Sequence, residues 1–289
     1  MKKLLLSTLL CLVLMTHLAQ AENTKPTAPR LISTDAFTTE LLFALEADHQ
    51  LIAVDVTSKL PADYRKLANI GYHRTLSAEG ILNLRPTRII GSEHMGPPTV
   101  LSALEQANID VLKLPAALSS EQLSSNISVL ARAVSREHKA QQLLAQLDTQ
   151  LQQLQQYSLN NQRIAFVFAL DANKLRLAGS HTNGDALIAL TQGSNVADFE
   201  NYRSVSAESL LALAPDIIII TGRNADSGID DVLVANPILK HTPAGKNNNI
   251  VAVDGNTLIA GLSPAAVDQA LAVAKRVNRT KLAVSSTQP

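Results

Sequence analysis

A 14-residue segment that occurs twice constrains the fold more than any other feature of this chain. Residues 77–90 and 206–219 are identical at 8 of 14 positions, and the two copies are 129 residues apart. Each copy starts with a serine that suits a helix N-cap, continues with an apolar stripe, and reaches a proline followed by an isoleucine-rich run. Because proline stops a helix, each copy predicts a short helix followed by a buried strand. The repeat therefore predicts two similar α/β lobes.

Short apolar strands alternate with amphipathic helices in both halves of the chain. This spacing is typical of Rossmann-like α/β lobes, whose central, mostly parallel sheets are covered by helices on both faces. The predicted strands are 30–33, 51–54, 89–90 and 109–112 in the first half, and 163–170, 174–178, 217–221 and 250–253 in the second. The predicted helices include 39–45, 100–106, 185–190 and 263–277.

The segment between the two patterns predicts one long helix. Residues 119–157 contain no glycine or proline. Leucines at helical spacing form a single apolar stripe on the second part of this segment, and Gln, Lys and Asp cover the rest. We therefore expect an N-terminal lobe at 28–134, a single long connecting helix at 135–158 and a C-terminal lobe at 159–280. The leucines of the stripe are Leu143, Leu144, Leu147, Leu151 and Leu154.

Residues 1–21 have the pattern of a secretory signal peptide. A basic end is followed by an apolar run from 4 to 18 and by a small-residue cleavage site, Ala-Gln-Ala, at 19–21. We expect cleavage after Ala21 and an exported, soluble protein of the periplasm. The single cysteine, Cys11, lies inside the apolar run, so the mature chain would carry no disulfide and no thiolate metal site.

Charge and motif content argue against two broad classes of function. Of the 25 basic side chains two belong to the signal peptide, which leaves 23 against 25 acidic ones, and no basic cluster indicates a nucleic-acid partner. The chain also lacks Gly-x-Ser-x-Gly, Gly-x-Gly-x-x-Gly and His-Glu-x-x-His, three motifs that mark common enzyme sites. We therefore expect a binding protein rather than an enzyme.

A chemical cluster precedes the first copy of the repeat and has no counterpart before the second. Residues 71–74, Gly-Tyr-His-Arg, predict an exposed turn that holds a phenol, an imidazole and a guanidinium side by side. Aromatic residues make up only 3% of the chain, which has four tyrosines and no tryptophan, so each tyrosine is informative. Two α/β lobes joined by a rigid helix, in an exported chain without a catalytic motif, indicate a ligand held between the lobes.

The segment 71–80, Gly-Tyr-His-Arg-Thr-Leu-Ser-Ala-Glu-Gly, resembles one that is typical of periplasmic haem-binding proteins of ABC importers. These proteins belong to a helix-linked class of substrate-binding proteins that serves haem, siderophores and cobalamin. The resemblance covers essentially the whole mature chain. Residues 184–190 and the stretch around 206–208 match the same group, although these two motifs mark only the wider class.

The resemblance implies a transport role. It implies that the protein captures haem (hemin) in the cleft between the lobes, as a transported ligand, and delivers it to an inner-membrane ABC permease and its ATPase. An outer-membrane haem receptor system would supply the ligand upstream, and the binding protein would act as a monomer.

Tyr72 is the expected axial ligand of the haem iron. Ferric haem needs an axial donor, and phenolate oxygen is one that proteins use. A free tyrosine has a pKa of about 10, so the iron and a nearby guanidinium would have to favour the anion. Arg74 could supply that hydrogen bond or pair with a haem propionate. The alternative for Tyr72 is a loop aromatic that packs on the sheet edge.

Three histidines are further candidates for the haem pocket. His73 adjoins the tyrosine, His94 follows the strand of the first repeat copy, and His181 precedes the first helix of the second lobe. Some members of the family add a histidine ligand just after the strand that ends near Leu170, but residues 169–172 read Ala-Leu-Asp-Ala here. Five-coordinate iron and His181 as a substitute ligand both stay open. Ordinary surface positions are expected for His49, His138 and His241.

Glu79 and Glu208 occupy equivalent positions in the two repeat copies, two residues after the N-cap. An acidic residue in the first turn of a helix gains about 0.3–1 kcal/mol from the helix dipole, which would explain either one alone. In the family that the chain resembles, one glutamate on each lobe pairs with arginines of the permease. Because both copies retain the residue, we expect Glu79 and Glu208 to dock the protein on its permease.

Other ligands suit the same scaffold: cobalamin, a ferric siderophore, or a metal ion held by His73, His94, His181 and a carboxylate. The absence of tryptophan argues weakly against large ligands held in aromatic cages. A metal site would need converging imidazoles, and the chain has no His-x-His pair or His-rich loop. An absorbance spectrum recorded after adding hemin would separate these alternatives.

Overall fold

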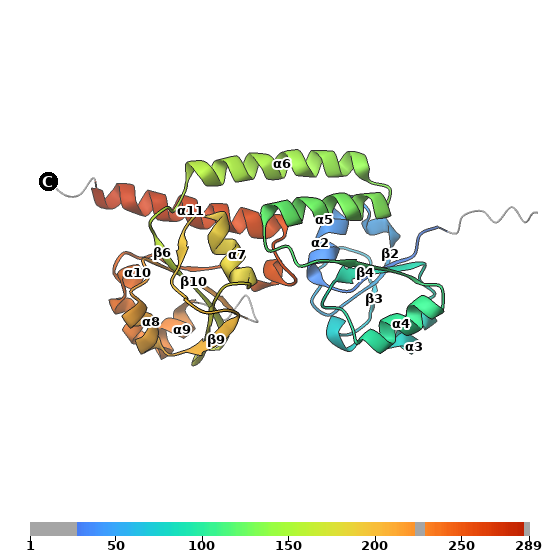
Figure 1. Cartoon of the computed structure of the whole chain (residues 1–289), viewed down its shortest axis with the longest axis horizontal. Coiled ribbons are helices and arrows are strands. Elements are labelled where there is room, and N and C mark those ends of the chain that lie inside the picture. The colour runs from blue at the N-terminus through green and yellow to red at the C-terminus, as the bar shows by residue number, and fades with distance from the viewer. Residues whose placement is uncertain (1–27, 223–228, 286–289) are drawn as a thin grey trace, which may run out of the picture.

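Two α/β lobes stand side by side in the computed structural model, which describes residues 28–222 and 229–285 (Figure 1). The long helix α6 (Glu137–Gln156) runs over both lobes on one side. This architecture confirms the predicted fold class of two lobes with central sheets. The predicted signal peptide, residues 1–21, lies outside the described residues. Within the described part of the chain, no helix is both long and apolar enough to cross a bilayer.

The N-terminal lobe is built on a five-stranded parallel sheet with the order β3-β2-β1-β4-β5. The direction of winding reverses between β1 and β4, and open α/β sheets bind ligands in the crevice that such a reversal creates at the carboxyl ends of the strands. The strands are β1 (Leu31–Ser33), β2 (Leu51–Val54), β3 (Ala68–Asn69), β4 (Arg88–Ser92) and β5 (Asp110–Leu114). The helices are α2 (Ala36–Ala44), η1 (Asp48–Gln50), η2 (His73–Thr75), α3 (Ala78–Asn83), α4 (Pro98–Gln106) and α5 (Ser120–Ala133).

The C-terminal lobe contains a six-stranded mixed sheet with the order β11-β10-β6-β7-β9, and β8 pairs with β6 beside this path. The strands β11, β10 and β6 are parallel, whereas β7 is antiparallel to β6 and β9. Only residues 172–173 separate β6 from β7, which is too short for the crossover that parallel strands need. The strands are β6 (Arg163–Asp171), β7 (Lys174–Ala178), β8 (Ser194–Asn195), β9 (Tyr202–Val205), β10 (Ile217–Gly222) and β11 (Ile250–Ala252). The helices are α7 (Asn183–Leu190), α8 (Ala207–Leu213), α9 (Ile229–Ala235), η3 (Pro237–His241), α10 (Pro243–Lys246), η4 (Gly255–Leu258) and α11 (Pro264–Ser285).

The two copies of the repeat fold into equivalent helix–strand units, as predicted. Ser77 caps α3 by accepting the Gly80 N–H at 3.2 Å, and Ser206 caps α8 by accepting the Ser209 N–H at 3.2 Å. The buried strands β4 and β10 follow. These units put α3 and α8 on the side of the molecule opposite α6 (Figure 1).

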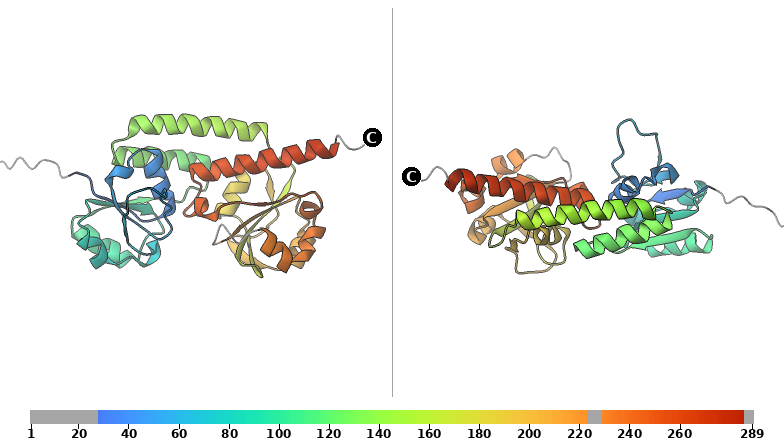
Figure 2. Two further views of the ribbon diagram at one scale, coloured as in Figure 1. Left: turned by 180° about the vertical axis from the view of Figure 1, so that it is seen from behind. Right: turned by 90° about the horizontal axis from the view of Figure 1, so that it is seen from above.

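The segment 119–157, which lacks glycine and proline, forms two helices. α5 ends at Ala133, Ser135 adopts a left-handed φ of 56°, and α6 begins at Glu137. A length of 20 residues makes α6 about 30 Å long. α6 contacts α5 of one lobe and α11 of the other, and Figure 2 shows α6 and α11 side by side from above. The helix therefore spans the boundary between the lobes.

The two lobes share one apolar core and are also joined by direct hydrogen bonds. The core cluster continues from β1 through α6 to α11. The Leu262 N–H donates to the Ala117 carbonyl at 2.7 Å. Glu40 on α2 accepts the Ala265 N–H at the start of α11 at 2.8 Å. Lobes joined in this way have little freedom for large relative rotations.

Candidate functional site

A pocket lies between the two lobes, and both lobes line it. Its volume is about 290 Å³, at the lower end of the range of roughly 300–1,000 Å³ for small-molecule sites. The N-terminal lobe contributes Thr57, Tyr72, His73, Arg74 and His94. The C-terminal lobe contributes Phe166, Phe168, Arg176, Asn183, Tyr202, Thr221, Gly255, Leu258, Ile259 and Ala260.

Tyr72 projects from the turn between β3 and α3. Gly71 has a left-handed φ of 81°, its carbonyl accepts the Val56 N–H at 3.0 Å, and its own N–H donates to the Asn69 side chain at 2.8 Å. Glycine suits this position because residues with a Cβ rarely adopt a positive φ. The bonds fix the backbone, while Tyr72 remains 42% exposed at the pocket. The turn therefore holds the phenol where a ligand can reach it.

His94 belongs to a second loop, which follows β4 and is bonded to the Tyr72 turn. The Gly96 N–H donates to the His73 carbonyl at 2.8 Å, and the Leu76 N–H donates to the Gly96 carbonyl at 2.9 Å. Both loops lie at the carboxyl edge of the first sheet, the edge at which α/β folds bind ligands. This pairing brings Tyr72 and His94 into one wall of the pocket.

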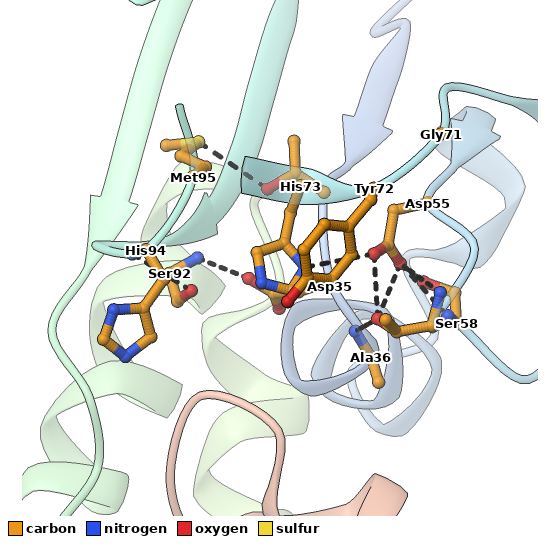
Figure 3. A network of polar contacts seen from close by, with 12 residues as sticks. Asp35, Ala36, Asp55, Ser58, Gly71, Tyr72, His73, Ser92, His94 and Met95 are labelled. Atoms are coloured by element: carbon orange, nitrogen blue, oxygen red, sulfur yellow. Dashed lines mark hydrogen bonds and ion pairs between the residues drawn. The ribbon is translucent and has the colours of Figure 1, made fainter. Parts of the chain in front are cut away.

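The trio of exposed side chains predicted at 72–74 forms only in part, because His73 turns inward. Tyr72 and Arg74 are exposed, whereas the His73 side chain is only 4% exposed. Its Nδ1 lies 3.3 Å from Oδ2 of the buried Asp55, at the end of β2 (Figure 3). A buried imidazole needs a polar partner, and the carboxylate supplies it. This non-local contact explains the difference from the prediction.

The opposite wall of the pocket is mainly apolar and comes from the C-terminal lobe. Phe166 and Phe168 belong to β6, while Leu258, Ile259 and Ala260 come from the end of η4 and the residues after it. Such a surface gains free energy when it covers the flat apolar face of a ligand.

The sequence patterns did not point to two polar residues of this wall, Arg176 and Tyr202. The Arg176 guanidinium on β7 donates to the Tyr202 carbonyl at 2.7 Å and lies 5.8 Å from the centre of the Tyr202 ring. The polar–apolar alternation along 174–178 is the signal that could have found Arg176, since it puts this residue on the face opposite Leu175 and Leu177.

Thr221, near the carboxyl end of β10, carries a buried hydroxyl that finds no hydrogen-bond partner among the described residues. The residue is only 4% exposed and lines the pocket. A buried polar group without a partner costs about 1–3 kcal/mol. The hydroxyl therefore favours a ligand with a polar group on this side.

Among the residues that the structure describes, those that line the pocket carry positive charge and include no acidic side chain. Burial lowers the pKa of His94, and the charge of Arg74 lowers it further, so this imidazole is neutral at neutral pH. Burial raises the pKa of Tyr202 against the opposing effect of its hydrogen bonds, so this phenol keeps its proton. Of the described lining residues, Arg74 and Arg176 are therefore the charged groups that a ligand meets.

His181 lies outside this pocket. It occupies the turn before α7 with a left-handed φ of 61°, its side chain is 70% exposed, and its Nε2 lies 3.9 Å from Glu200 Oε1. The metal site considered from the sequence does not assemble, because His181 is apart from the other histidines. Within the described residues, no group of three or more His, Cys, Asp or Glu side chains is placed to hold a metal ion. The candidates that the structure brings together are Tyr72, His73, Arg74 and His94.

Glu79 and Glu208 are exposed in the first turns of α3 and α8. Both helices lie on the side opposite α6, one on each lobe (Figure 1). A hydrogen bond from its own N–H and one from the Ser206 hydroxyl lower the pKa of Glu208. This carboxylate is therefore charged at neutral pH and free to meet a cationic partner.

Two α/β lobes, a helix that spans them and a ligand-sized pocket between them define a two-lobed binding protein. The chain belongs to the periplasmic binding protein family, which residues 31–257 match. The match takes in parts of both lobes and the whole connecting helix. The family consists of substrate-binding transport proteins rather than enzymes.

Solved structures similar to this chain include two haem-binding proteins. A periplasmic haem-binding protein of Vibrio cholerae is 36% identical, with a TM-score of 0.80, over 87% of this chain and 99% of that one. A periplasmic haem-binding protein of Pseudomonas aeruginosa is 31% identical, with a TM-score of 0.77, over 86% of this chain and 92% of that one.

A vitamin B12-binding protein of Vibrio cholerae is 28% identical over 194 residues, which are 66% of this chain and 70% of that one.

Proposed function

We propose that this protein captures haem in the pocket between its lobes and delivers it to the permease of an ABC importer. The observation that carries the proposal is the exposed phenol of Tyr72, which lies beside Arg74 and opposite an apolar wall. Haem has the matching features: an iron that takes an axial donor, two flat apolar faces and anionic propionates. Haem is here the transported ligand and not a resident cofactor.

Tyr72 supplies the axial ligand of the iron in this proposal. A phenolate oxygen is a hard anionic donor, which Fe(III) prefers. The iron and the Arg74 guanidinium both favour the anionic phenolate, which is the form that binds the iron. Reduction of the iron weakens this bond, which suits a carrier that has to release its cargo.

The other residues of the pocket suit the rest of the haem. Phe168 and Leu258 offer apolar surface to the porphyrin faces. Arg74 and Arg176 carry guanidinium groups, which match carboxylates in shape and charge, and the Thr221 hydroxyl adds a polar atom. His94, neutral and at the pocket, is the candidate for a second axial ligand, and without it the iron is five-coordinate.

Cobalamin is the second candidate ligand, because the curated relatives of this chain include vitamin B12-binding proteins. Two observations favour haem. The two haem-binding proteins are more similar to this chain and match more of it. In addition, phenolate oxygen is an axial ligand of ferric haem iron, so the phenol at the pocket supports haem and gives no corresponding support to a corrin.

Absorbance titrations with hemin and with cyanocobalamin test the proposal. We expect hemin to bind with a Soret shift and a phenolate-to-iron charge-transfer band, and excess cyanocobalamin to leave both unchanged. Saturable binding of cyanocobalamin that displaces hemin, or hemin binding without any band of a phenolate complex, would contradict it.

The delivery step rests on the two glutamates. We propose that Glu79 and Glu208, one exposed on each lobe, contact arginines of the permease, whose ATPase drives import. In this proposal the protein is exported to the periplasm, its signal peptide is cleaved after Ala21, and the mature monomer receives haem from an outer-membrane receptor system. The equivalence of the two glutamates within the repeat supports this docking role.

A further inference from the structure

The buried imidazole of His73 contacts the ring of Tyr72, and the proposed function gives it no task. The two ring centres are 4.3 Å apart, and the ring planes are inclined by 49°. Figure 3 shows the phenol lying against the imidazole. The His73 side chain is 4% exposed, while Tyr72 is 42% exposed. One partner of this contact is therefore fixed in the protein interior, and the other reaches the pocket.

Asp55 holds the His73 ring in one orientation. Its Oδ2 lies 3.3 Å from His73 Nδ1, and its carboxylate is fully buried. The same carboxylate accepts hydrogen bonds of 2.8–3.1 Å from the N–H and hydroxyl groups of Thr57 and Ser58. A carboxylate oxygen is a hydrogen-bond acceptor, so this contact suits an imidazole that donates from Nδ1. These hydrogen bonds restrain the Asp55 side chain and, through it, the imidazole.

The backbone of His73 is fixed as well, because its carbonyl accepts the Gly96 N–H at 2.8 Å. Gly96 belongs to the loop that carries His94. The imidazole is therefore held by its ring, through Asp55, and by its backbone, through the neighbouring loop. A side chain so restrained is suited to support a more exposed neighbour.

We propose that His73, anchored by Asp55, is the positioning residue of Tyr72: it supports one face of the phenol ring and so directs the hydroxyl into the pocket. This inference rests on the proposed function, in which Tyr72 binds the iron. The support works through ring contact and needs no change in the protonation of His73. Contacts between such rings are expected to change affinity by about two- to tenfold.

Two substitutions separate the ring from its anchor. His73→Asn keeps a donor where Nδ1 stands, so Asp55 retains its partner, but it removes most of the ring. His73→Phe keeps a ring against Tyr72 and removes the donor. Urea unfolding of both variants shows whether they fold. The Asn variant keeps the hydrogen bond to Asp55 and loses the ring contact, whereas the Phe variant keeps the ring contact and loses the hydrogen bond.

Tyrosine NMR without any haem tests the contact itself. The chain has four tyrosines, so protein with ¹³C-labelled tyrosine shows few ring signals, and Tyr72→Phe identifies the one from Tyr72. His73→Asn is expected to shift or broaden this signal and to leave those of Tyr64, Tyr157 and Tyr202 in place. An unchanged Tyr72 signal in His73→Asn overturns the inference, whatever the haem results are.

A double-mutant cycle with hemin tests the role. His73→Asn is expected to weaken hemin binding about two- to tenfold and to move the charge-transfer band, while having no further effect in the Tyr72→Phe background. His73→Phe is expected to recover part of the lost affinity. Equal losses from His73→Asn in both backgrounds, or equal losses in the Asn and Phe variants, would overturn the positioning role. An unchanged hemin spectrum in Tyr72→Phe alone would instead overturn the proposed iron ligand.

Discussion

Gly261 and Ala117 join the two lobes backbone to backbone. They form a parallel bridge, in which the next residue, Leu262, donates its N–H to the Ala117 carbonyl at 2.7 Å. Gly261 has a φ of 121°, and a Cβ on it would lie 2.4 Å from the Ala117 nitrogen. The close approach leaves no room for a side chain at position 261, which directly follows Ala260, a residue that lines the pocket. The geometry of the pocket therefore depends on this glycine.

Gly261→Ala is expected to lower the free energy of unfolding by about 1–3 kcal/mol, because it combines a strained φ with a steric overlap. Urea unfolding measures the loss. Gly80→Ala is the matched control: a Cβ there would meet nothing closer than 3.6 Å, and alanine in a helix is favoured by about 0.5–1 kcal/mol. Equal stability of Gly261→Ala and the wild type would contradict the close packing at this bridge.

Glu40 links the lobes at the start of α11 and should make their stability depend on pH. Burial is the largest effect on the Glu40 carboxyl and raises its pKa. Hydrogen bonds from Ala265 and Ser263 lower this pKa, whereas the nearby charges of Asp268 and Asp254 raise it further. Because the folded-state pKa lies above the unfolded value, the folded state holds the proton more tightly. This contribution to stability is fully present below the unfolded pKa and is lost as the pH rises through the folded one.

Glu40→Gln keeps an acceptor for the Ala265 N–H and has no charge to bury. Relative to the wild type, the variant should therefore gain stability at neutral pH, and this gain should shrink toward about pH 4. Urea unfolding at the two pH values measures it, with Glu105→Gln at an exposed site as the control. A difference between Glu40→Gln and the wild type that does not change with pH would contradict the raised pKa.

Local patterns predicted the features that a short segment determines by itself. The caps at Ser77 and Ser206 and the strands after them depend on neighbouring residues, so the repeat was sufficient to predict them. The break between α5 and α6 at Ser135 could not be predicted in this way, because a serine in the left-handed conformation has no distinctive sequence pattern. The antiparallel direction of β7 could have been predicted, because the predicted strands 163–170 and 174–178 leave only three residues between them, too few for the crossover that parallel strands need.

The candidate site was predictable only where sequence neighbours act together. Tyr72 and Arg74 are close in the sequence and reach the pocket from one turn. The inward orientation of His73 depends on Asp55, which is 18 residues away in the chain, and the place of Arg176 depends on the approach of the second lobe. Contacts of this kind are set by the tertiary fold, and a single sequence carries no direct signal for them.

Arg74→Gln tests the electrostatics of the pocket. The positive charge of Arg74 contributes to the lowered pKa of His94, so its removal should raise that pKa, which NMR titration of the protein without haem measures. The same variant should bind hemin about tenfold more weakly, because a hydrogen bond to a charged group is lost. A His94 pKa that does not rise would show that the two side chains do not interact.

Replacing Glu79 and Glu208 together by alanine tests the docking role. Both side chains are exposed and lie away from the pocket, so hemin binding should be unchanged. Haem transport into vesicles that contain the permease and its ATPase should fall, on the order of tenfold for the loss of two ion pairs. Full transport by the double variant would leave the helix dipole as the only reason for these residues.

A hemin titration of Tyr72→Phe tests the assignment of the haem ligand most directly, because this substitution deletes the iron donor and keeps the ring that packs against His73. Tyr157→Phe, on an exposed tyrosine at the end of α6, is the matched control. Tyr72→Phe is expected to lose the phenolate-to-iron charge-transfer band and to bind hemin about 100-fold more weakly, while Tyr157→Phe keeps both the band and the affinity. A Tyr72→Phe variant with the spectrum and affinity of the wild type would contradict the assignment of Tyr72 as the haem ligand.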